Sequence, residues 1–404
     1  MRKTANVAII GGGIVGCALA YYLSKRIKGV VVIERRGVAS EASGANYGMV
    51  WQQTRLPGLD IAMARRSLAM YEELTSEVFD IDIEYEKKGG MTVFFTPIQK
   101  KLMEQVVQVK RDIGIPLEVL DGGDARRLEP ALSPEILGST YCPDEAQLNP
   151  IPTTLAFARA ARRHGAEILT DTAVHSIEVA AGRVQGLTTN RGKIATSTVV
   201  NATGAWAAEV AKMIDLDVPI FPQRLQSMAT CPMPPLVHRV LQGARMIHDE
   251  AEASPEKVLQ VAVDLGSDTE TLPQDRLEDS IFPYIKPTKS DNIVLGTTTE
   301  FAGFDRRTHP DALALIGDAT SSIVPALEHY TIIRSWANFV PFTMDSLPIL
   351  GEVPAIRGFY MAAGHAHAFS HAPSTGEALA ALIVDGQPTM SLEEASLNRF
   401  RSRR

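Results

Sequence analysis

The sequence predicts an α/β protein in which a doubly wound domain with a parallel sheet is interleaved with an α+β domain built on a mostly antiparallel sheet. Two observations predict this class. A strand, a glycine-rich turn and a helix follow one another near the N-terminus and again near the C-terminus, and the stretches between them are rich in short strands. A chain of 404 residues is long enough for about two domains.

The N-terminal stretch carries the most specific pattern. Residues 6–10 form a short apolar, β-branched run that is typical of a buried parallel strand. Gly11, Gly13 and Gly16 follow with the spacing G-x-G-x-x-G. In that motif the first glycine permits the tight turn, the second lets the backbone approach a pyrophosphate, and the third allows close packing of helix on strand. The helix that follows would present its N-terminal N–H groups to the phosphates.

The residues after the motif complete a Rossmann-like unit. Apolar residues recur at helical spacing from Val15 to Leu23, and 30–33 form a second apolar strand. That strand ends on Glu34, where a carboxylate can accept hydrogen bonds from a ribose 2′-hydroxyl. The motif therefore predicts a bound dinucleotide. The alternative is a glycine-rich turn in an ordinary β-α-β unit without a nucleotide.

Composition excludes several classes of protein. A net charge of −7 argues against a nucleic-acid or anionic-membrane surface as the main partner. No run of about 18 apolar residues predicts a membrane span, and three glycines interrupt the apolar run that an export signal would need. The three cysteines lack metal-ligand spacing and are fewer than the four that an iron–sulfur cluster usually takes. We therefore expect a cytoplasmic protein with reduced thiols.

The order of elements predicts two discontinuous domains. Residues 1–85, 150–215 and 325–404 are assigned to the dinucleotide-binding domain, and residues 86–149 and 216–324 to the second domain. The pattern predicts helices over 57–79, 97–113, 150–163, 310–324 and 374–384, and a strand over 329–339. Polar stretches at 249–256 and 266–279 are expected to be surface loops.

Four blocks, in this order, make the sequence resemble the FAD-dependent amine and amino-acid oxidoreductases, which include D-amino acid oxidase, glycine oxidase and sarcosine oxidase. The blocks are 7–34, 42–48, 199–206, and 334–351 with Gly364 and His365. Within that family, 334–336 and 363–373 look most like the flavin-bearing B (β) subunits of octopine and nopaline oxidases. Similar chains occur in multi-subunit proline and hydroxyproline dehydrogenases and in hydrogen cyanide synthase.

The resemblance implies non-covalently bound FAD and a set of residues around it. Glycines of the first motif would face the pyrophosphate, Glu34 the adenosine ribose, and the loop after Gly364 the isoalloxazine ring. The residues expected at the cofactor are Gly11, Gly13, Gly16, Glu34, Arg35, Ser43, Asn46, Gly48, Val174, Ala202, Gly204, Trp206, Gly364, His365, Ala368 and Phe369. No metal site is expected: the metal alternative for His365, His367 and His371 lacks an acidic or thiol partner at ligand spacing.

The resemblance also implies oxidation of a carbon–nitrogen bond, by hydride transfer from the substrate carbon to flavin N5 and hydrolysis of the resulting imine. His365 is the first candidate for keeping the amine neutral. Glycine-oxidase-like enzymes carry a carboxylate-binding arginine where this chain has Val340. The substrate carboxylate must therefore bind Arg334, Arg55, Tyr284 or a backbone donor.

Substrate and partners follow from the finer resemblance. An opine such as octopine or nopaline would be split into an amino acid and a 2-oxo acid, and electrons would pass through partner subunits to a quinone-like acceptor. Any FMN or iron–sulfur cluster would belong to those partners, which could also attach the chain to the inner membrane. The alternatives are a proline or hydroxyproline dehydrogenase subunit, a glycine, sarcosine or D-amino acid oxidase that makes hydrogen peroxide, a non-catalytic electron relay, and an NAD-dependent dehydrogenase.

Overall fold

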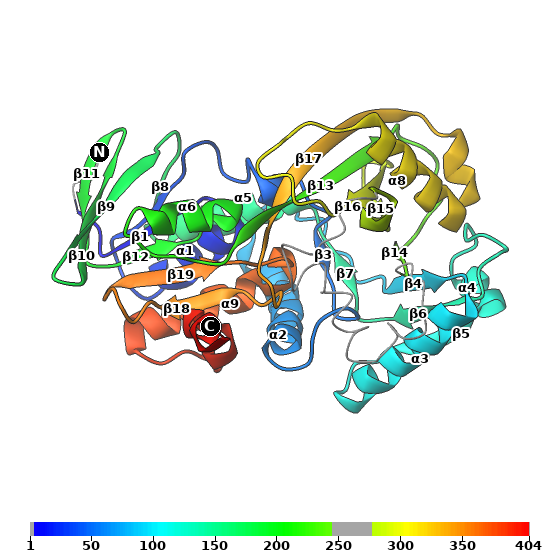
Figure 1. The fold of residues 1–404 in the computed structure, drawn as a ribbon, viewed down its shortest axis with the longest axis horizontal. Coiled ribbons are helices and arrows are strands. Elements are labelled where there is room, and N and C mark those ends of the chain that lie inside the picture. The colour runs from blue at the N-terminus through cyan, green and yellow to red at the C-terminus, as the bar shows by residue number, and fades with distance from the viewer. Residues whose placement is uncertain (1–3, 245–276, 404) are drawn as a thin grey trace.

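The structure, a computed structural model, describes residues 4–244 and 277–403 (Figure 1). Within these residues the strands form a six-stranded sheet, an eight-stranded sheet, and smaller sheets of three and two strands. Figure 1 shows the six-stranded sheet in the left half of the molecule and the eight-stranded sheet in the right half, with α2 (Leu59–Glu73) between them. Both chain ends lie on the side of the six-stranded sheet.

The six-stranded sheet has the order β18-β19-β12-β1-β2-β8, and every neighbouring pair except β18–β19 is parallel. All residues of β1 and β2 are buried, as expected for parallel strands that are covered on both faces. The strands are β1 (Val7–Ile10), β2 (Val30–Ile33), β8 (Glu167–Leu169), β12 (Val199–Asn201), β18 (Ile349–Glu352) and β19 (Phe359–Ala363).

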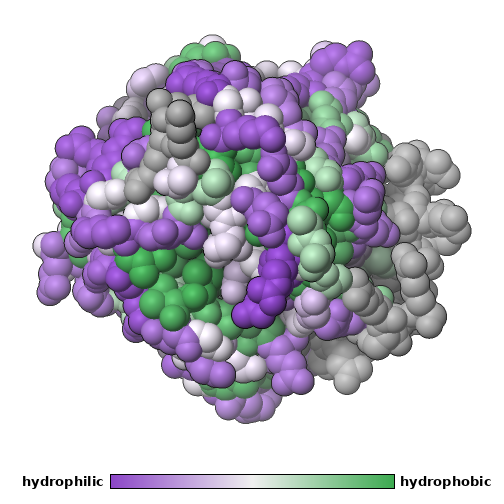
Figure 2. All heavy atoms as spheres, turned by 90° about the vertical axis from the view of Figure 1, so that its left-hand side faces the viewer, coloured by the Kyte–Doolittle hydropathy of each residue, from purple (hydrophilic) through white to green (hydrophobic). Residues whose placement is uncertain are grey.

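The two faces of this sheet are covered by different elements. Ile9 and Val32 pack with helices α1 (Ile14–Ser24), α5 (Pro150–Arg163) and α9 (Ala368–Asp385). Ala8 and Val31, on the opposite face, pack with the three-stranded sheet and with α6. These elements are β9 (Val174–Ala180), β10 (Arg183–Thr189), β11 (Gly192–Ala195) and α6 (Ala207–Lys212). Seen from the side of the six-stranded sheet, hydrophilic residues surround smaller apolar areas of the surface (Figure 2).

Helix α9 begins at Ala368, six residues before the predicted start, and contains Pro373. Proline lacks the N–H that would bond to the carbonyl four residues earlier, which is why the sequence predicts a later start. Packing overrides this local cost. Gly376 lies so close to α1 that an added Cβ would stand 2.9 Å from the backbone carbon of Ala18. Burial of this helix against α1 therefore fixes a segment that local propensity disfavours.

The eight-stranded sheet has the order β17-β13-β16-β15-β14-β4-β6-β5 and is antiparallel except for the pair β14–β4. Together with the parallel sheet it confirms the predicted α/β class with an antiparallel second sheet. Its strands are β4 (Gly90–Phe94), β5 (Glu118–Asp121), β6 (Gly138–Cys142), β13 (Phe221–Thr230), β14 (Val240–Gly243), β15 (Ile281–Pro287), β16 (Ile293–Thr298) and β17 (Ile332–Phe342). The helices beside it are α3 (Pro97–Asp112), α4 (Gly122–Leu128) and α8 (Pro310–Ile323).

Strand β17 departs from the expected division of the chain. The sequence places 325–404 with the dinucleotide-binding domain, but β17 pairs with β13 from Phe221 opposite Phe342 to Thr230 opposite Ile332. The pairing partner lies about a hundred residues earlier in the sequence, so no local pattern reveals it. The predicted loop at 249–256 and most of that at 266–279 lie outside the described residues.

Short elements complete the fold. A two-stranded sheet joins β3 (Met49–Val50) to β7 (Ala146–Gln147), and a π-helical turn at Leu74–Val78 continues α2. Short 3-10 helices lie at Ala42–Gly44, Gly204–Trp206, Leu277–Ser280, Pro325–His329, Glu393–Ala395 and Leu397–Arg403. In the two described ranges, every helix is too short or too polar to span a lipid bilayer.

Candidate functional site

A cavity of about 400 Å³ lies between the two large sheets. Part of its wall consists of residues at the carboxyl ends of β1, β2, β12 and β19, which we call the cofactor end. Ligands of open parallel α/β sheets bind at such strand ends. Another part comes from the loop 51–55 and from strands of the eight-stranded sheet, and we call this part the substrate end.

The glycines of the first motif shape the cofactor end. A Cβ at Gly11 would stand 2.4 Å from the carbonyl oxygen of Ala202, and its φ of +113° also favours glycine. A Cβ at Gly16 would stand 2.1 Å from the carbonyl oxygen of Gly11, so this glycine lets α1 pack onto the turn. Gly11 and Gly13 line the cavity, whereas Gly16 acts from behind it.

Glu34 is oriented by the backbone and still has capacity to bind a ribose. Its Oε2 accepts a hydrogen bond from the Gly12 N–H at 2.7 Å, and its Oε1 accepts one from the Arg36 N–H at 2.8 Å. Each carboxylate oxygen can accept two hydrogen bonds, so both retain room for a hydroxyl donor. Glu34 also lines the cavity, so its carboxylate is placed to bind an adenosine ribose.

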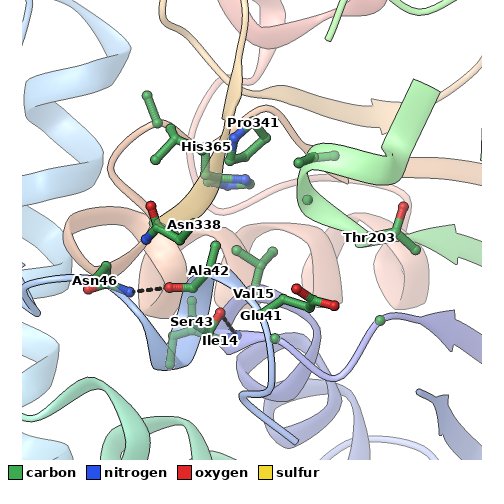
Figure 3. A pocket seen from close by; sticks show the side chains of 18 of the residues that line it. Ile14, Val15, Glu41, Ala42, Ser43, Asn46, Thr203, Asn338, Pro341 and His365 are labelled. Carbon is green, nitrogen blue, oxygen red and sulfur yellow. Dashed lines mark hydrogen bonds between the residues drawn. The ribbon is translucent and has the colours of Figure 1, made fainter. Parts of the chain in front are cut away.

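The loop 42–48 is held against the first turn of α1. Ser43 Oγ accepts a hydrogen bond from the Ile14 N–H at 2.9 Å, and Asn46 Nδ2 donates to the Ala42 carbonyl at 2.8 Å (Figure 3). The Gly48 N–H donates to Asn46 Oδ1 at 2.6 Å. Figure 3 shows these side chains on one side of the cavity and His365 beside Pro341 on another. The loop thus closes one side of the cofactor end.

Most of the residues expected at the cofactor lie around this one cavity. Arg35 places its guanidinium 4.2 Å from the ring centre of Trp206, at the cofactor end. Gly364 has a φ of +80° and does not line the cavity, although its sequence neighbours Ala363 and His365 do. The expected cofactor residues that line the cavity are Gly11, Gly13, Glu34, Arg35, Ser43, Asn46, Gly48, Val174, Ala202, Gly204, Trp206, His365, Ala368 and Phe369.

Arg55 is the cation of the substrate end. Its side chain is 2% exposed and lines the cavity. Nη2 donates to Thr54 Oγ1 at 2.7 Å, whereas Nε and Nη1 have no hydrogen-bond partner. Burial lowers the pKa of Arg55, although Asp60, with Oδ1 3.9 Å from Nη1, opposes this. A buried guanidinium with free donors is matched to a planar anion such as a carboxylate.

Aromatic residues stand around Arg55 at the substrate end. Tyr284 stacks on Tyr47 with ring centres 5.4 Å apart and packs against Phe282 at 5.0 Å. Tyr47 shares a 2.7 Å hydrogen bond with Ser227. Burial raises the pKa of Tyr284, which keeps its phenol protonated and able to donate. The arrangement offers a hydrogen-bond donor and apolar walls beside the guanidinium.

His365 lines the cavity as a neutral base. It is 3% exposed, and its Nε2 lies 3.0 Å from Thr375 Oγ1. Burial, together with the nearby His371, lowers the pKa of His365 to about 3. His371 lies behind the cavity wall, with Nε2 2.8 Å from Asp60 Oδ1. In residues 4–244 and 277–403, no three or more His, Cys, Asp or Glu side chains are grouped as metal ligands.

Arg334 does not reach the site, which corrects one of the sequence-based candidates. It lies in the exposed first part of β17, and its guanidinium is 5.6 Å from the ring centre of Trp336. It does not line the cavity, whereas Val340, further along the same strand, does. The sequence cannot show how far along a strand the cavity extends, because that depends on which strands pair.

The structure adds residues that sequence reasoning did not select. Tyr47, Gln223 and Phe282 line the cavity, and the buried Glu145 and Lys110 lie behind it. Lys110 had a detectable signal, since the buried face of α3 also contains Leu102 and Val106, spaced four residues apart. The other residues come from segments whose role depends on strand pairing.

Comparisons with known proteins identify the family. Residues 6–382 match the family described as FAD dependent oxidoreductase. A glycine oxidase from Geobacillus kaustophilus is 30% identical over 99% of this chain and 98% of its own length. The hydrogen cyanide synthase subunit HcnC of Pseudomonas aeruginosa is 28% identical over 90% of this chain and 88% of its own. The L-proline dehydrogenase structure from P. horikoshii shares the fold, with a TM-score of 0.84, 24% identity and coverage of 100% and 99%.

These comparisons confirm the family and the cofactor that the four sequence blocks predict. The crevice at the strand ends, the glycines that could not carry a Cβ and the oriented Glu34 carboxylate all fit FAD. The chain therefore belongs to the FAD dependent oxidoreductases, the family that includes glycine oxidase.

Proposed function

We propose that this chain oxidises the carbon–nitrogen bond of an amino acid with a secondary amine, of the opine class that includes octopine and nopaline. The observation that carries the proposal is Arg55, a buried guanidinium at the substrate end whose Nε and Nη1 have no hydrogen-bond partner. A substrate carboxylate would satisfy these donors, since planar guanidinium and carboxylate groups pair through two hydrogen bonds. Tyr284 supplies a further donor from the same wall.

The opine class is supported by the residues of β13 and β17 that face the cavity. The resemblance to glycine-oxidase-like enzymes implies that Val340 takes the place of their carboxylate-binding arginine, and Val340 pairs directly with Gln223 on β13. Both residues line the cavity. A small apolar side chain leaves space for a second arm on the substrate nitrogen, and the Gln223 amide can donate to a polar group on that arm.

The roles of the remaining residues follow from position and protonation. Bound FAD supplies a two-electron acceptor for the hydride that leaves the substrate carbon. Arg55 and Tyr284 hold the carboxylate, which fixes the substrate carbon relative to the acceptor. His365 remains an uncharged imidazole because burial lowers its pKa to about 3. A base with so low a pKa does not take up the ammonium proton, but its uncharged ring adds no positive charge beside the substrate and can accept a hydrogen bond from the N–H of the neutral amine.

The proposal extends to partner subunits. The HcnC relative is by name one subunit of a larger enzyme. We propose that this chain likewise works in a hetero-oligomeric dehydrogenase of the cytoplasm, which passes electrons to a quinone-like acceptor and attaches to the inner membrane only through partners. Co-purification of tagged chain expressed with its genomic neighbours tests this point. A purified chain that transfers electrons to a soluble quinone at full rate without any partner would contradict it.

The test of substrate class is anaerobic reduction of the flavin in the purified protein. Octopine, nopaline, proline, hydroxyproline, glycine and sarcosine are mixed in turn with the enzyme, and loss of the visible flavin absorbance is followed. We expect an opine to reduce the flavin fastest. In Val340→Arg, flavin reduction by opines should be slower, whereas reduction by glycine and sarcosine should be unchanged. Rapid reduction by glycine or sarcosine and none by opines would contradict the opine class. No reduction by any substrate would favour a non-catalytic electron relay.

A second candidate is a self-sufficient amino-acid oxidase. It is favoured by the 30% identity to a glycine oxidase over nearly the whole of both chains. Such an enzyme returns its electrons to oxygen and produces hydrogen peroxide. Stoichiometric peroxide from the isolated chain with glycine, sarcosine or a D-amino acid would support this candidate over the dehydrogenase.

A further inference from the structure

The loop that presents Arg55 to the cavity is held by a buried carboxyl group. Glu145, in the turn between β6 and β7, is 1% exposed. Its Oε1 accepts hydrogen bonds from the N–H groups of Gln52 at 2.9 Å and Gln53 at 2.8 Å, and its Oε2 accepts from Gln52 at 2.8 Å. Backbone N–H donors directed at one carboxyl group fix the course of the chain at the start of the loop.

A buried ammonium group holds the other end of the same loop. Lys110, on α3, has 0% exposure and donates from Nζ to the carbonyl oxygen of Arg55. The side chain of Gln53 adds bonds to the second sheet, from Nε2 to the Gly90 carbonyl at 3.0 Å and from the Thr140 hydroxyl to Oε1 at 2.6 Å. The loop 52–55 is thus attached to the eight-stranded sheet and α3.

We propose that Glu145 and Lys110 are positioning residues for Arg55, and that their combined charge sets how tightly Arg55 binds the substrate carboxylate. This inference rests on the proposed role of Arg55. The positions of the two groups support it, because they hold adjacent parts of one short loop and face the same guanidinium across a buried region. Charges in such a region interact much more strongly than charges in water.

The other charged groups around the pair come from α2, α9 and β6. Asp60 on α2 lies between Arg55 and His371 of α9. Burial would raise the pKa of Asp60, but Arg55 and His371 lower it below its usual value, so it stays ionised. Burial raises the pKa of the Cys142 thiol on β6, so it stays uncharged. Asp60 and Cys142 therefore keep their charge states near neutral pH, whereas the charge of the pair itself changes.

The direction of the pH effect follows from the two groups. Burial raises the pKa of Glu145 to about 8 and lowers the pKa of Lys110 to about 8. Below this pH the pair carries one positive charge, from the ammonium. Above it the pair carries one negative charge, from the carboxylate. The change makes the surroundings of Arg55 less favourable for an anion, so a carboxylate ligand binds more weakly at high pH, and by reciprocity its binding favours proton uptake.

The experiment uses propionate, which has the carboxylate but no amine that titrates in this range. Its dissociation constant is measured from the change in flavin absorbance of the holoenzyme, at about pH 7 and about pH 9. The variants are Glu145→Gln, which keeps the shape of the side chain, and Lys110→Met. Lys286→Met is the matched control, since Lys286 is also buried and donates to a carbonyl, that of Leu148, at 2.8 Å. Burial lowers the pKa of Lys286 to about 8 as well.

We expect the wild type and Lys286→Met to bind propionate about fivefold or more weakly at the higher pH. In Glu145→Gln and Lys110→Met the ratio of the two constants falls to about half or less of the wild-type ratio, because each variant removes one of the two ionisations. A purely structural role would weaken binding equally at both pH values. An unchanged ratio in Glu145→Gln, or a reduced ratio in Lys286→Met, overturns the proposal.

The same titration separates this inference from the proposed function. If Arg55→Met binds propionate as tightly as the wild type, Arg55 does not hold the carboxylate and both proposals fail. If Arg55→Met loses binding while Glu145→Gln keeps the wild-type ratio, only the role of Glu145 and Lys110 fails. Glutamine has nearly the same shape as glutamate, so Glu145→Gln should fold. Its ratio of dissociation constants therefore tests the proposal even if Lys110→Met does not fold.

Discussion

The two ends of the cavity are built in different ways. The cofactor end uses backbone groups and small residues from one continuous unit, where Gly11, Gly16 and Glu34 lie within 34 residues of the N-terminus. The substrate end uses side chains, with Arg55 before α2 and Tyr284 on β15. The first end depends on close approach of backbone atoms, and the second on charges enclosed by several segments. The comparison predicts that mutations at the two ends affect different measurements.

The largest effect is expected at the cofactor end. In Gly11→Ala, the new Cβ would stand 2.4 Å from the Ala202 carbonyl oxygen at a φ of +113°, so the turn must shift. We expect the purified variant to retain little or no FAD, measured as the ratio of flavin to protein absorbance. Gly37→Ala is the control, because nothing lies within 4 Å of its Cβ. If purified Gly11→Ala had the wild-type ratio of flavin to protein absorbance, the turn at Gly11 would not be part of the cofactor site.

At the substrate end, Arg55→Met should separate catalysis from cofactor binding. Removing one partner of a buried, hydrogen-bonded charge pair costs about 4 kcal/mol, which corresponds to a fall of about a thousandfold in kcat/KM. Flavin content should stay at the wild-type level. Arg55→Lys keeps the charge but not the planar fork, so part of the loss should remain. Dye-linked steady-state kinetics measure kcat/KM for Arg55→Met and for Arg55→Lys. Loss of flavin from Arg55→Met would contradict the separation of the two ends.

His365 lies where the two ends meet, and its effect should appear in stability at low pH. Burial lowers its pKa from 6.5 to about 3, so between these values the unfolded chain binds a proton that the folded chain does not. Its contribution to stability is therefore complete above pH 6.5 and is lost as pH falls toward 3. The slope reaches about 1.4 kcal/mol per pH unit.

We expect His365→Gln to show a shallower loss of stability between about pH 6.5 and about pH 4.5 in urea unfolding with excess FAD. The exposed His175 on β9 provides the control variant, His175→Gln, which should keep the wild-type slope. Equal slopes in the His365 variant and the wild type would show that the imidazole accepts a proton in the folded protein.

The smallest effect is expected at Arg334, just beyond the substrate end. This arginine is exposed and does not line the cavity. Arg334→Ala should change kcat/KM by no more than about twofold, as is usual for surface substitutions. A tenfold rise in KM with unchanged kcat would instead assign a carboxylate contact to Arg334. Together, Arg334→Ala and Arg55→Met form a matched pair of arginine removals inside and outside the cavity.

Prediction from sequence was successful where a feature depends on neighbours along the chain. The first β-α-β unit, the loop with Ser43 and Asn46, and the small residues after β12 all come to the cavity as expected. It was less successful for β17, whose partner β13 is distant in sequence, and for the start of α9, where packing on α1 outweighs Pro373. It could not separate Arg55 from Arg334, because burial decided between them.

The sequence by itself determined the family and the cofactor, since glycines at this spacing between a strand and a helix leave the space that a tight turn, a pyrophosphate and close helix packing require. Only the tertiary structure decided which arginine lines the substrate end and which charges lie behind it. In the sequence Arg55 is only one of several candidates for the substrate carboxylate, and nothing there joins it to Glu145 and Lys110. Their chemistry arises from burial beside one another, and burial is a property of the packed chain rather than of any one segment.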